Sequence, residues 1–298
     1  MGRKGADDFA DCVIRRSSQD TIIRSKYIVL MVLISLACAA AISYILCERY
    51  VLRGMLTEDS FDVVSLELIS CLCCFLNFTM YLICRRVRDH HERDIVWRRA
   101  LIDYLSSYGL DVKRLENIDA RASEGRHALM AVVSFILWFA SVLLSVSLVL
   151  IIMVEGSVSL QLRAIFQVGY IMVLVQFICT LGTAVRYPAR HDSLQVEFVD
   201  EMQPMLEGLG IHVDAMKPIA AGHGFLINLI LFLLTFGLYA LYMIGSSATR
   251  MNRHMFSQWA YEEKLLSEIM RVEGATGINV INAEQDPKMI VRLAKGFT

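Results

Sequence analysis

The sequence has few charges and no familiar catalytic signature. Only 20% of its 298 residues are charged, whereas 56% are hydrophobic, and the mean hydropathy is +0.50. Scarce charge argues against a soluble domain, because soluble domains do not gather apolar residues in uncharged runs of about twenty. The phosphate-binding patterns GxxxxGK[ST] and GxGxxG are missing, as are the hydrolase pattern GxSxG and the zinc pattern HExxH. These absences assign no catalytic residue and no cofactor, and they favour a protein without enzymatic activity.

Net charge and cysteine usage exclude two further classes. The formal net charge is −1, so no global field attracts nucleic acid. Most of the eight cysteines lie in or at the ends of apolar runs, where cysteine acts as a small hydrophobic residue and not as part of a secreted disulfide framework. The expected partners are therefore the lipid bilayer and, beyond it, a cytoplasmic or membrane protein or a second copy of the chain.

Five hydrophobic runs of more than twenty residues predict the fold. At a rise of about 1.5 Å per residue, about twenty residues cross a bilayer core, so each run is long enough. We expect an all-α integral membrane protein, a helical bundle of four full spans plus a fifth hydrophobic segment. The predicted organisation is an N-terminal tail (1–26), a first transmembrane hairpin (27–84), a helical connector (85–127), a second transmembrane hairpin (128–185), a second connector (186–221), the fifth segment (222–249) and a C-terminal amphipathic helix and tail (250–298).

The distribution of basic residues predicts the orientation. Six Lys and Arg residues precede the first run, and ten lie within residues 85–127. The short connections inside the two hairpins have two and none, respectively. By the positive-inside rule, the N-terminus and the connectors are cytoplasmic and the chain is a multi-pass protein of the cell membrane.

The two connectors are related by an internal repeat. Shifted by 101 residues, segment 79–118 aligns without gaps with segment 180–219, and seven positions coincide. Both copies end in similar tetrapeptides that begin at Gly109 and Gly210, and a third tetrapeptide, GINV, occupies 277–280. Gly109 and Gly210 fit the position that turns a chain out of a helix. Repeats of this kind indicate a duplicated unit of hydrophobic hairpin followed by cytoplasmic helix.

Each copy has an aromatic residue seven positions after a histidine. The aromatic residues are Trp97, Phe198 and Tyr261, and apolar residues follow them at spacings that fall on one face of an α-helix. We expect three amphipathic helices that lie on the bilayer or against their neighbours, with these three aromatic residues as candidates for docking a partner. Pro188 is expected to prevent a smooth continuation of the fourth run into the second connector helix.

Three histidines, His90, His191 and His254, precede these apolar helix faces and allow two interpretations. An imidazole has both apolar and polar atoms, so it is stable at the depth of the lipid headgroups. In the first interpretation each ring therefore only begins an amphipathic face. Alternatively, the three rings converge into a metal site, because ligands on different elements need no fixed sequence spacing. The pattern shows none of the acidic partners that metal-binding histidines generally have.

The fifth run raises a problem of sidedness. If residues 224–249 cross the membrane once, the C-terminal segment lies outside the cell. Its basic residues predict the cytoplasmic side instead, and so does its repeat relation to the two cytoplasmic connectors. A hairpin bent near Gly237 resolves the conflict, with arms of about 18 Å that enter but do not cross a core of about 30 Å. A single long helix is the alternative.

The same region carries a resemblance. The stretch TFGLYALY at 235–242, followed by MNRHMFSQWAYEEKLL, resembles an uncharacterised archaeal and bacterial membrane family whose hydrophobic hairpin has the motif T-x-G-[IL]-Y-x-[LP]-[YW]. The match covers 225–269, and Met243 stands where many members have tryptophan. The resemblance implies a prokaryotic multi-span membrane protein of unassigned activity and assigns no catalytic residue.

Function follows from these features only as a class. Repeated amphipathic helices without catalytic motifs favour a non-enzymatic scaffold, sensor or regulator that acts through its cytoplasmic helices. The alternative is a small-solute or ion transporter or channel built from duplicated hairpins, with Gln167 and Gln176 along the solute path.

Overall fold

The computed structural model describes residues 2–47, 58–155, 159–216, 224–235 and 238–274. Every regular element in these ranges is a helix. The helices are α1 (Gly2–Gln19), α2 (Ser25–Cys47), α3 (Glu58–Ser107), α4 (Lys113–Ser123), α5 (His127–Glu155), α6 (Leu160–Gly208), α7 (Phe225–Leu234) and α8 (Tyr239–Val272).

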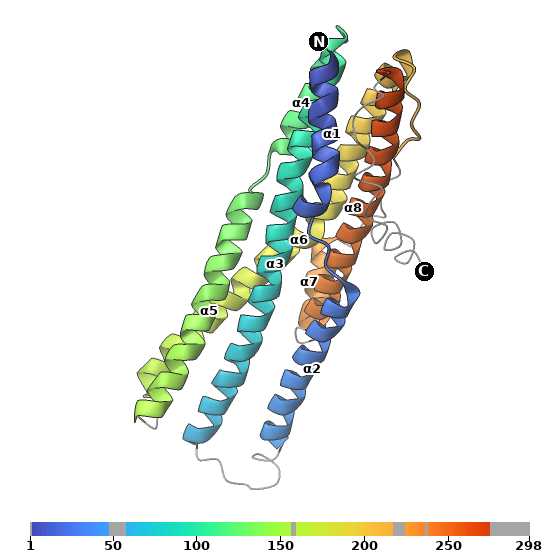
Figure 1. Cartoon of the computed structure of the whole chain (residues 1–298). Coiled ribbons are helices and arrows are strands. Elements are labelled where there is room, and N and C mark those ends of the chain that lie inside the picture. Colours follow the sequence, from blue (N-terminus) through green and yellow to red (C-terminus); the bar gives the residue numbers. More distant parts are fainter. Residues whose placement is uncertain (1, 48–57, 156–158, 217–223, 236–237, 275–298) are drawn as a thin grey trace.

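Three long helices, α3, α6 and α8, connect the two halves of the bundle (Figure 1). Helices α1 and α4 lie beside them in one half, and α2, α5 and α7 accompany them in the other. The predicted boundaries between span and connector, at 84/85 and 185/186, fall inside α3 and α6. Each connector helix therefore continues the apolar segment before it in line. Of the two arrangements expected, this one differs from helices lying on a bilayer surface and agrees with helices packed against their neighbours.

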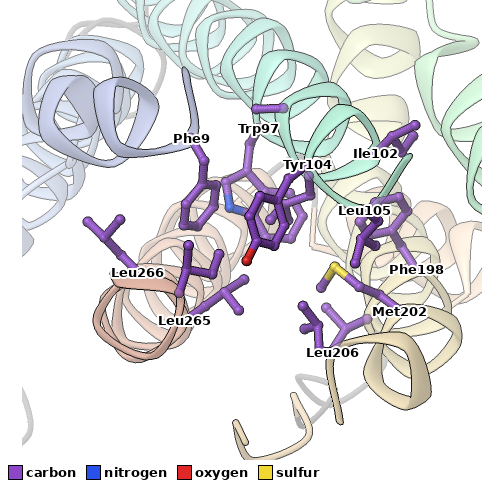
Figure 2. Packing of buried hydrophobic residues seen from close by; sticks show 14 of the residues in the cluster. Phe9, Trp97, Ile102, Tyr104, Leu105, Phe198, Met202, Leu206, Leu265 and Leu266 are labelled. Atoms are coloured by element: carbon purple, nitrogen blue, oxygen red, sulfur yellow. The ribbon is translucent and has the colours of Figure 1, made fainter. Parts of the chain in front are cut away.

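The half that contains α1 and α4 encloses the main hydrophobic core. Trp97, Leu105 and Phe198 are completely buried there, and the rings of Trp97 and Phe198 are 5.8 Å apart. Figure 2 shows these side chains meeting residues of α1 and α8, among them Phe9 and Leu265. The apolar faces predicted for the connector helices are thus buried against one another, and the N-terminal tail is part of the fold.

The other half leaves much apolar surface uncovered. In the described part of the chain, two helices are long and apolar enough to cross a membrane, one within Lys113–Leu148 and the other α6. Only 17% and 33% of their most apolar windows are buried. Large side chains such as Phe139, Ile171 and Met172 are at least half exposed. Apolar surface on this scale marks an interaction with lipid or with another protein.

Helix α6 runs without interruption through Pro188, contrary to the break expected there. Proline lacks the N–H that would bond to the carbonyl four residues earlier, which is that of Ala184. The hydroxyl of Ser247, on α8, donates to this carbonyl at 3.2 Å instead. A neighbouring helix thus supplies the missing donor, which explains why the helix tolerates proline here.

The fifth hydrophobic segment folds back on itself. The Tyr239 hydroxyl, at the start of α8, donates to Oδ1 of Asn228 in α7 at 3.2 Å. In one continuous helix these two residues would be about 16 Å apart, so the single-helix alternative is excluded. Gly237, at which the bend is predicted, lies outside the described residues. Because α7 and α8 form two arms, α8 returns to the half of the bundle that contains the ends of α3 and α6 (Figure 1).

Glycines end the three long helices. Gly109 and Gly210 have φ of 76° and 78°, a left-handed conformation that glycine adopts without a steric cost, as predicted for both. After α6, the N–H of Ile211 bonds to the carbonyl of Leu206 at 2.9 Å, the longer bond of a Schellman motif. The third helix ends at Gly274, with φ of 63°, and the GINV tetrapeptide lies outside the described residues.

Candidate metal centre

The structure brings His90, His191 and His254 together. They come from α3, α6 and α8, and their side chains are at most 4% exposed. The ring centroids are 5.2 Å apart for His90–His191, 5.2 Å for His90–His254 and 4.9 Å for His191–His254. One nitrogen from each ring lies within 4.8 Å of the other two. We call these residues the three-histidine cluster.

The direction of α8 completes the cluster. His90 and His191 lie about two turns beyond the apolar parts of α3 and α6, on helices that run in parallel through the bundle. His254 joins them because α7 and α8 form two arms, so that α8 runs back towards the same end. A single crossing by the fifth segment would have placed His254 at the opposite end of the bundle.

Carboxylates orient two of the three rings. Nδ1 of His90 lies 2.8 Å from Oδ1 of Asp20, and Nδ1 of His254 lies 3.0 Å from Oδ1 of Asp192. A carboxylate only accepts hydrogen bonds, so both Nδ1 atoms carry the proton and both Nε2 atoms present a lone pair. These two Nε2 atoms, and that of His191, are buried and have no hydrogen-bond partner. Metal-binding histidines are typically oriented in this way.

A third carboxylate, Asp94, lies beside the cluster. Its Oδ2 is 3.7 Å from Nε2 of His191, too far for a hydrogen bond. Gln258 donates to Oδ1 at 3.0 Å, and Arg98 forms an ion pair with Oδ2. Burial on its own raises the pKa of Asp94, but the charges around it, that of Arg98 first among them, together outweigh burial and the pKa is lowered overall. Asp94 is therefore ionised, and it contributes negative charge next to the three-histidine cluster.

Asp20 also fixes the N-terminal segment to the centre. Its Oδ2 accepts a hydrogen bond from the indole N–H of Trp259 at 2.7 Å and lies 3.1 Å from Nε of Arg93. Arg93 in turn binds both carboxylate oxygens of Glu262, at 2.9 and 3.0 Å. A buried charge is costly unless it is paired, and Arg93 is paired with the carboxylates of both Asp20 and Glu262. The network holds the Asp20–His90 pair in place.

Burial determines the protonation of the centre. It lowers the pKa of His90, although Asp20 opposes the shift. Burial also raises the pKa of Asp20, but the hydrogen bonds from His90 and Trp259, together with the charge of Arg93, lower it overall. The pair therefore consists of a carboxylate and an imidazole that resists protonation. A neutral imidazole is the form that binds a metal ion.

The residues predicted to dock a partner lie inside the protein. Trp97 and Phe198 are completely buried, and Tyr261 is 7% exposed. All three belong to the main core between α3, α6 and α8. Each ring therefore contacts other helices of the same chain and presents no surface to a second protein.

The glutamines predicted to line a solute path lie elsewhere. Gln167 is exposed and Gln176 is half-buried, both on the uncovered apolar half of α6. A buried polar contact between helices does occur in this half, where Nδ2 of Asn77 donates to the hydroxyl of Ser141 at 2.8 Å. It joins α3 to α5 directly and serves packing.

The carboxylates near the three histidines were not predicted from the sequence. Asp192 directly follows His191, and Asp94 lies one helical turn after His90, so both were available as signals. Asp20 gave no such signal, because it lies seventy positions from the histidine that it orients. No family model, curated protein or solved structure matches the chain. The resemblance seen at residues 225–269 stays a prediction, and the function must be argued from the geometry.

Proposed function

We propose that this chain is an integral membrane protein that binds a transition-metal ion, with Zn²⁺ as the best candidate, through His90, His191 and His254. The observation that carries the proposal is the set of three buried Nε2 atoms without partners, two of them on rings whose Nδ1 atoms donate to carboxylates. Leaving three buried acceptors unsatisfied costs roughly 1–3 kcal/mol each, and a shared metal ion removes that cost.

The donor set narrows the choice of metal. Imidazole nitrogen suits Zn²⁺, copper, iron and nickel, whereas Mg²⁺ and Ca²⁺ prefer oxygen. Three histidines form a site of the open kind, in which a fourth position stays available to an outside ligand. A metal ion held there supplies a Lewis acid, with the carboxylate of Asp94 next to it.

The membrane part of the proposal rests on the uncovered apolar half. Two helices there are long and apolar enough to cross a bilayer, and their apolar side chains are largely exposed. We propose four spans, at 27–47, 63–84, 128–154 and 164–185, with the fifth segment as a hairpin that enters the same side. The basic tail and connectors then place the metal centre on the cytoplasmic side of the cell membrane.

Metal binding has more support than the functions expected from composition. A scaffold or regulator would have to use a surface other than Trp97, Phe198 and Tyr261, because these are buried within the chain. A transporter would have to use residues other than Gln167, whose side chain is exposed on the outside of α6.

Metal content of the purified protein tests the proposal. The protein is prepared with a tag that lacks histidine, and its metals are counted by elemental analysis. We expect close to one zinc ion per chain, reduced at least tenfold in His254→Ala. The matched control is His212→Ala, which removes an exposed histidine outside the cluster and should leave the zinc content unchanged. A protein without metal, which also fails to bind added zinc, would disprove the function.

A further inference from the structure

A cavity of about 330 Å³ lies beside the metal centre, between the start of α5 and the middle of α6. Four arginines line it, namely Arg121, Arg126, Arg186 and Arg190, against a single carboxylate, that of Glu124. We call this cavity the arginine pocket. Arg121 also forms an ion pair with Glu197, so the four guanidinium groups are opposed by two carboxylates. The remaining positive charge makes a concave surface that attracts an anion and can bind phosphate oxygens through several N–H groups at once.

Neutral polar groups in the same walls have unmet hydrogen-bonding capacity. Tyr187 lines the pocket and is 7% exposed, and its buried hydroxyl has no hydrogen-bond partner. Nδ1 of His127, another lining residue, is also buried and unpartnered. Buried polar atoms in native proteins are nearly always hydrogen-bonded. Two unpartnered polar atoms on the walls of one basic cavity therefore indicate that a ligand forms hydrogen bonds with them.

The position of the pocket identifies the rest of the ligand. Met130 and Thr183, which also line it, belong to the apolar segments of α5 and α6. On the same face of α6 as Thr183, eleven and fifteen residues earlier, Met172 and Val168 are 68% and 57% exposed. A phosphate group in the pocket can therefore continue into acyl chains along this apolar surface. Basic pockets between membrane helices on the cytoplasmic side bind the head groups of anionic lipids.

We propose that the arginine pocket binds the phosphate monoester head group of an anionic lipid. The pocket is a second site, and its proposed ligand does not require the metal ion. The two sites nevertheless share one residue, because His191 lines the pocket and belongs to the three-histidine cluster. The ring of Tyr187 lies against that of His191, with centroids 5.1 Å apart and planes 14° apart. A head group in the pocket would thus lie next to the metal centre.

Calorimetric titration of the full-length protein in a neutral detergent tests this proposal. The probes are dihexanoyl phosphatidate, dihexanoyl phosphatidylcholine and inorganic phosphate. We expect the phosphatidate to bind and the zwitterionic lipid not to bind. The variant Arg126→Gln/Arg190→Gln should bind the phosphatidate about thirtyfold more weakly, from a factor of about five for each arginine.

The control variant is Lys113→Gln/Arg114→Gln, which removes the same charge from α4 without touching the pocket, and it should bind within twofold of the unaltered protein. Inorganic phosphate that binds as tightly as the phosphatidate, with the same dependence on the arginines, would support the phosphate site and assign its occupant to free phosphate. Equal binding of both lipids, equal loss in both variants, or no binding at all would overturn the proposal. Zinc content is measured on the same samples. A protein that binds zinc but no phosphatidate would overturn only the lipid proposal, and a protein that binds phosphatidate but no zinc would overturn only the metal centre.

Discussion

Replacing Asp20 by asparagine changes one oxygen to an NH₂ group and keeps the shape of the side chain. In the structure, Oδ1 of Asp20 faces Nδ1 of His90, while Oδ2 faces the donors of Trp259 and Arg93. The single oxygen of an amide accepts from more donors when it lies on the side of Trp259 and Arg93, which both donate, than on the side of His90. The NH₂ group of the new side chain should therefore point at His90.

This arrangement reverses the tautomer of His90. Nδ1 must then accept a hydrogen bond from the amide, so the proton moves to Nε2, the buried atom that has no hydrogen-bond partner. Before the variant can bind a metal ion, the proton must return to Nδ1 of His90, and the new hydrogen bond is broken. Both changes weaken metal binding. Loss of an outer-shell carboxylate typically weakens metal binding by about 10–100-fold, which corresponds to about 1.4–2.8 kcal/mol.

Competition between the protein and a chelator of known zinc affinity measures this effect. The matched control is Asp11→Asn, which removes the same charge from the N-terminal segment at an exposed position of α1 and should leave zinc affinity unchanged. Thermal unfolding of both variants without metal shows whether the fold is intact. If Asp20→Asn folds and binds zinc within twofold of the unaltered protein, the proposed role of the carboxylate is wrong.

Three further predictions concern packing and pH. Ser247→Ala should cost about 1–3 kcal/mol of unfolding free energy, and almost nothing when Pro188→Ala restores the helical N–H, as a double-mutant cycle would show. Trp97→Ala should cost about 3–5 kcal/mol in denaturant unfolding and the exposed neighbour Val96→Ala at most about 0.5, so equal losses would refute the assignment of the core. Because burial lowers the pKa of His90, protons should compete weakly with zinc, and zinc affinity should fall less than about tenfold between pH 7.5 and pH 6.0. A larger fall would indicate histidines with ordinary pKa values.

Much of the core could be predicted from hydrophobic periodicity. A stripe at helical spacing after each histidine indicates one apolar face per helix, and Trp97 and Phe198 do lie on such buried faces. Glycine conformations were also predictable, because a glycine that follows an apolar stripe often ends a helix. Periodicity does not specify what a face contacts, which is why rings that close the core were expected to dock a partner.

The continuity of α6 and the carboxylates of the metal centre depend on tertiary contacts. Pro188 is tolerated because Ser247 reaches the carbonyl left without a donor, and no local pattern encodes that contact. Asp20 reaches His90 only because α1 folds against α3. Three histidines at equivalent positions of a repeat left convergence as one of two interpretations, because convergence also needed the fifth segment to turn back.

The most direct test of the central claim is X-ray absorption spectroscopy at the zinc K-edge of the purified, zinc-loaded protein. We predict a first shell with three imidazole nitrogens at about 2.0–2.1 Å, together with the outer-ring scattering typical of histidine, and loss of this signal in the variant His90→Ala. A shell dominated by sulfur at about 2.3 Å, or an oxygen shell without imidazole scattering, would contradict the three-histidine centre.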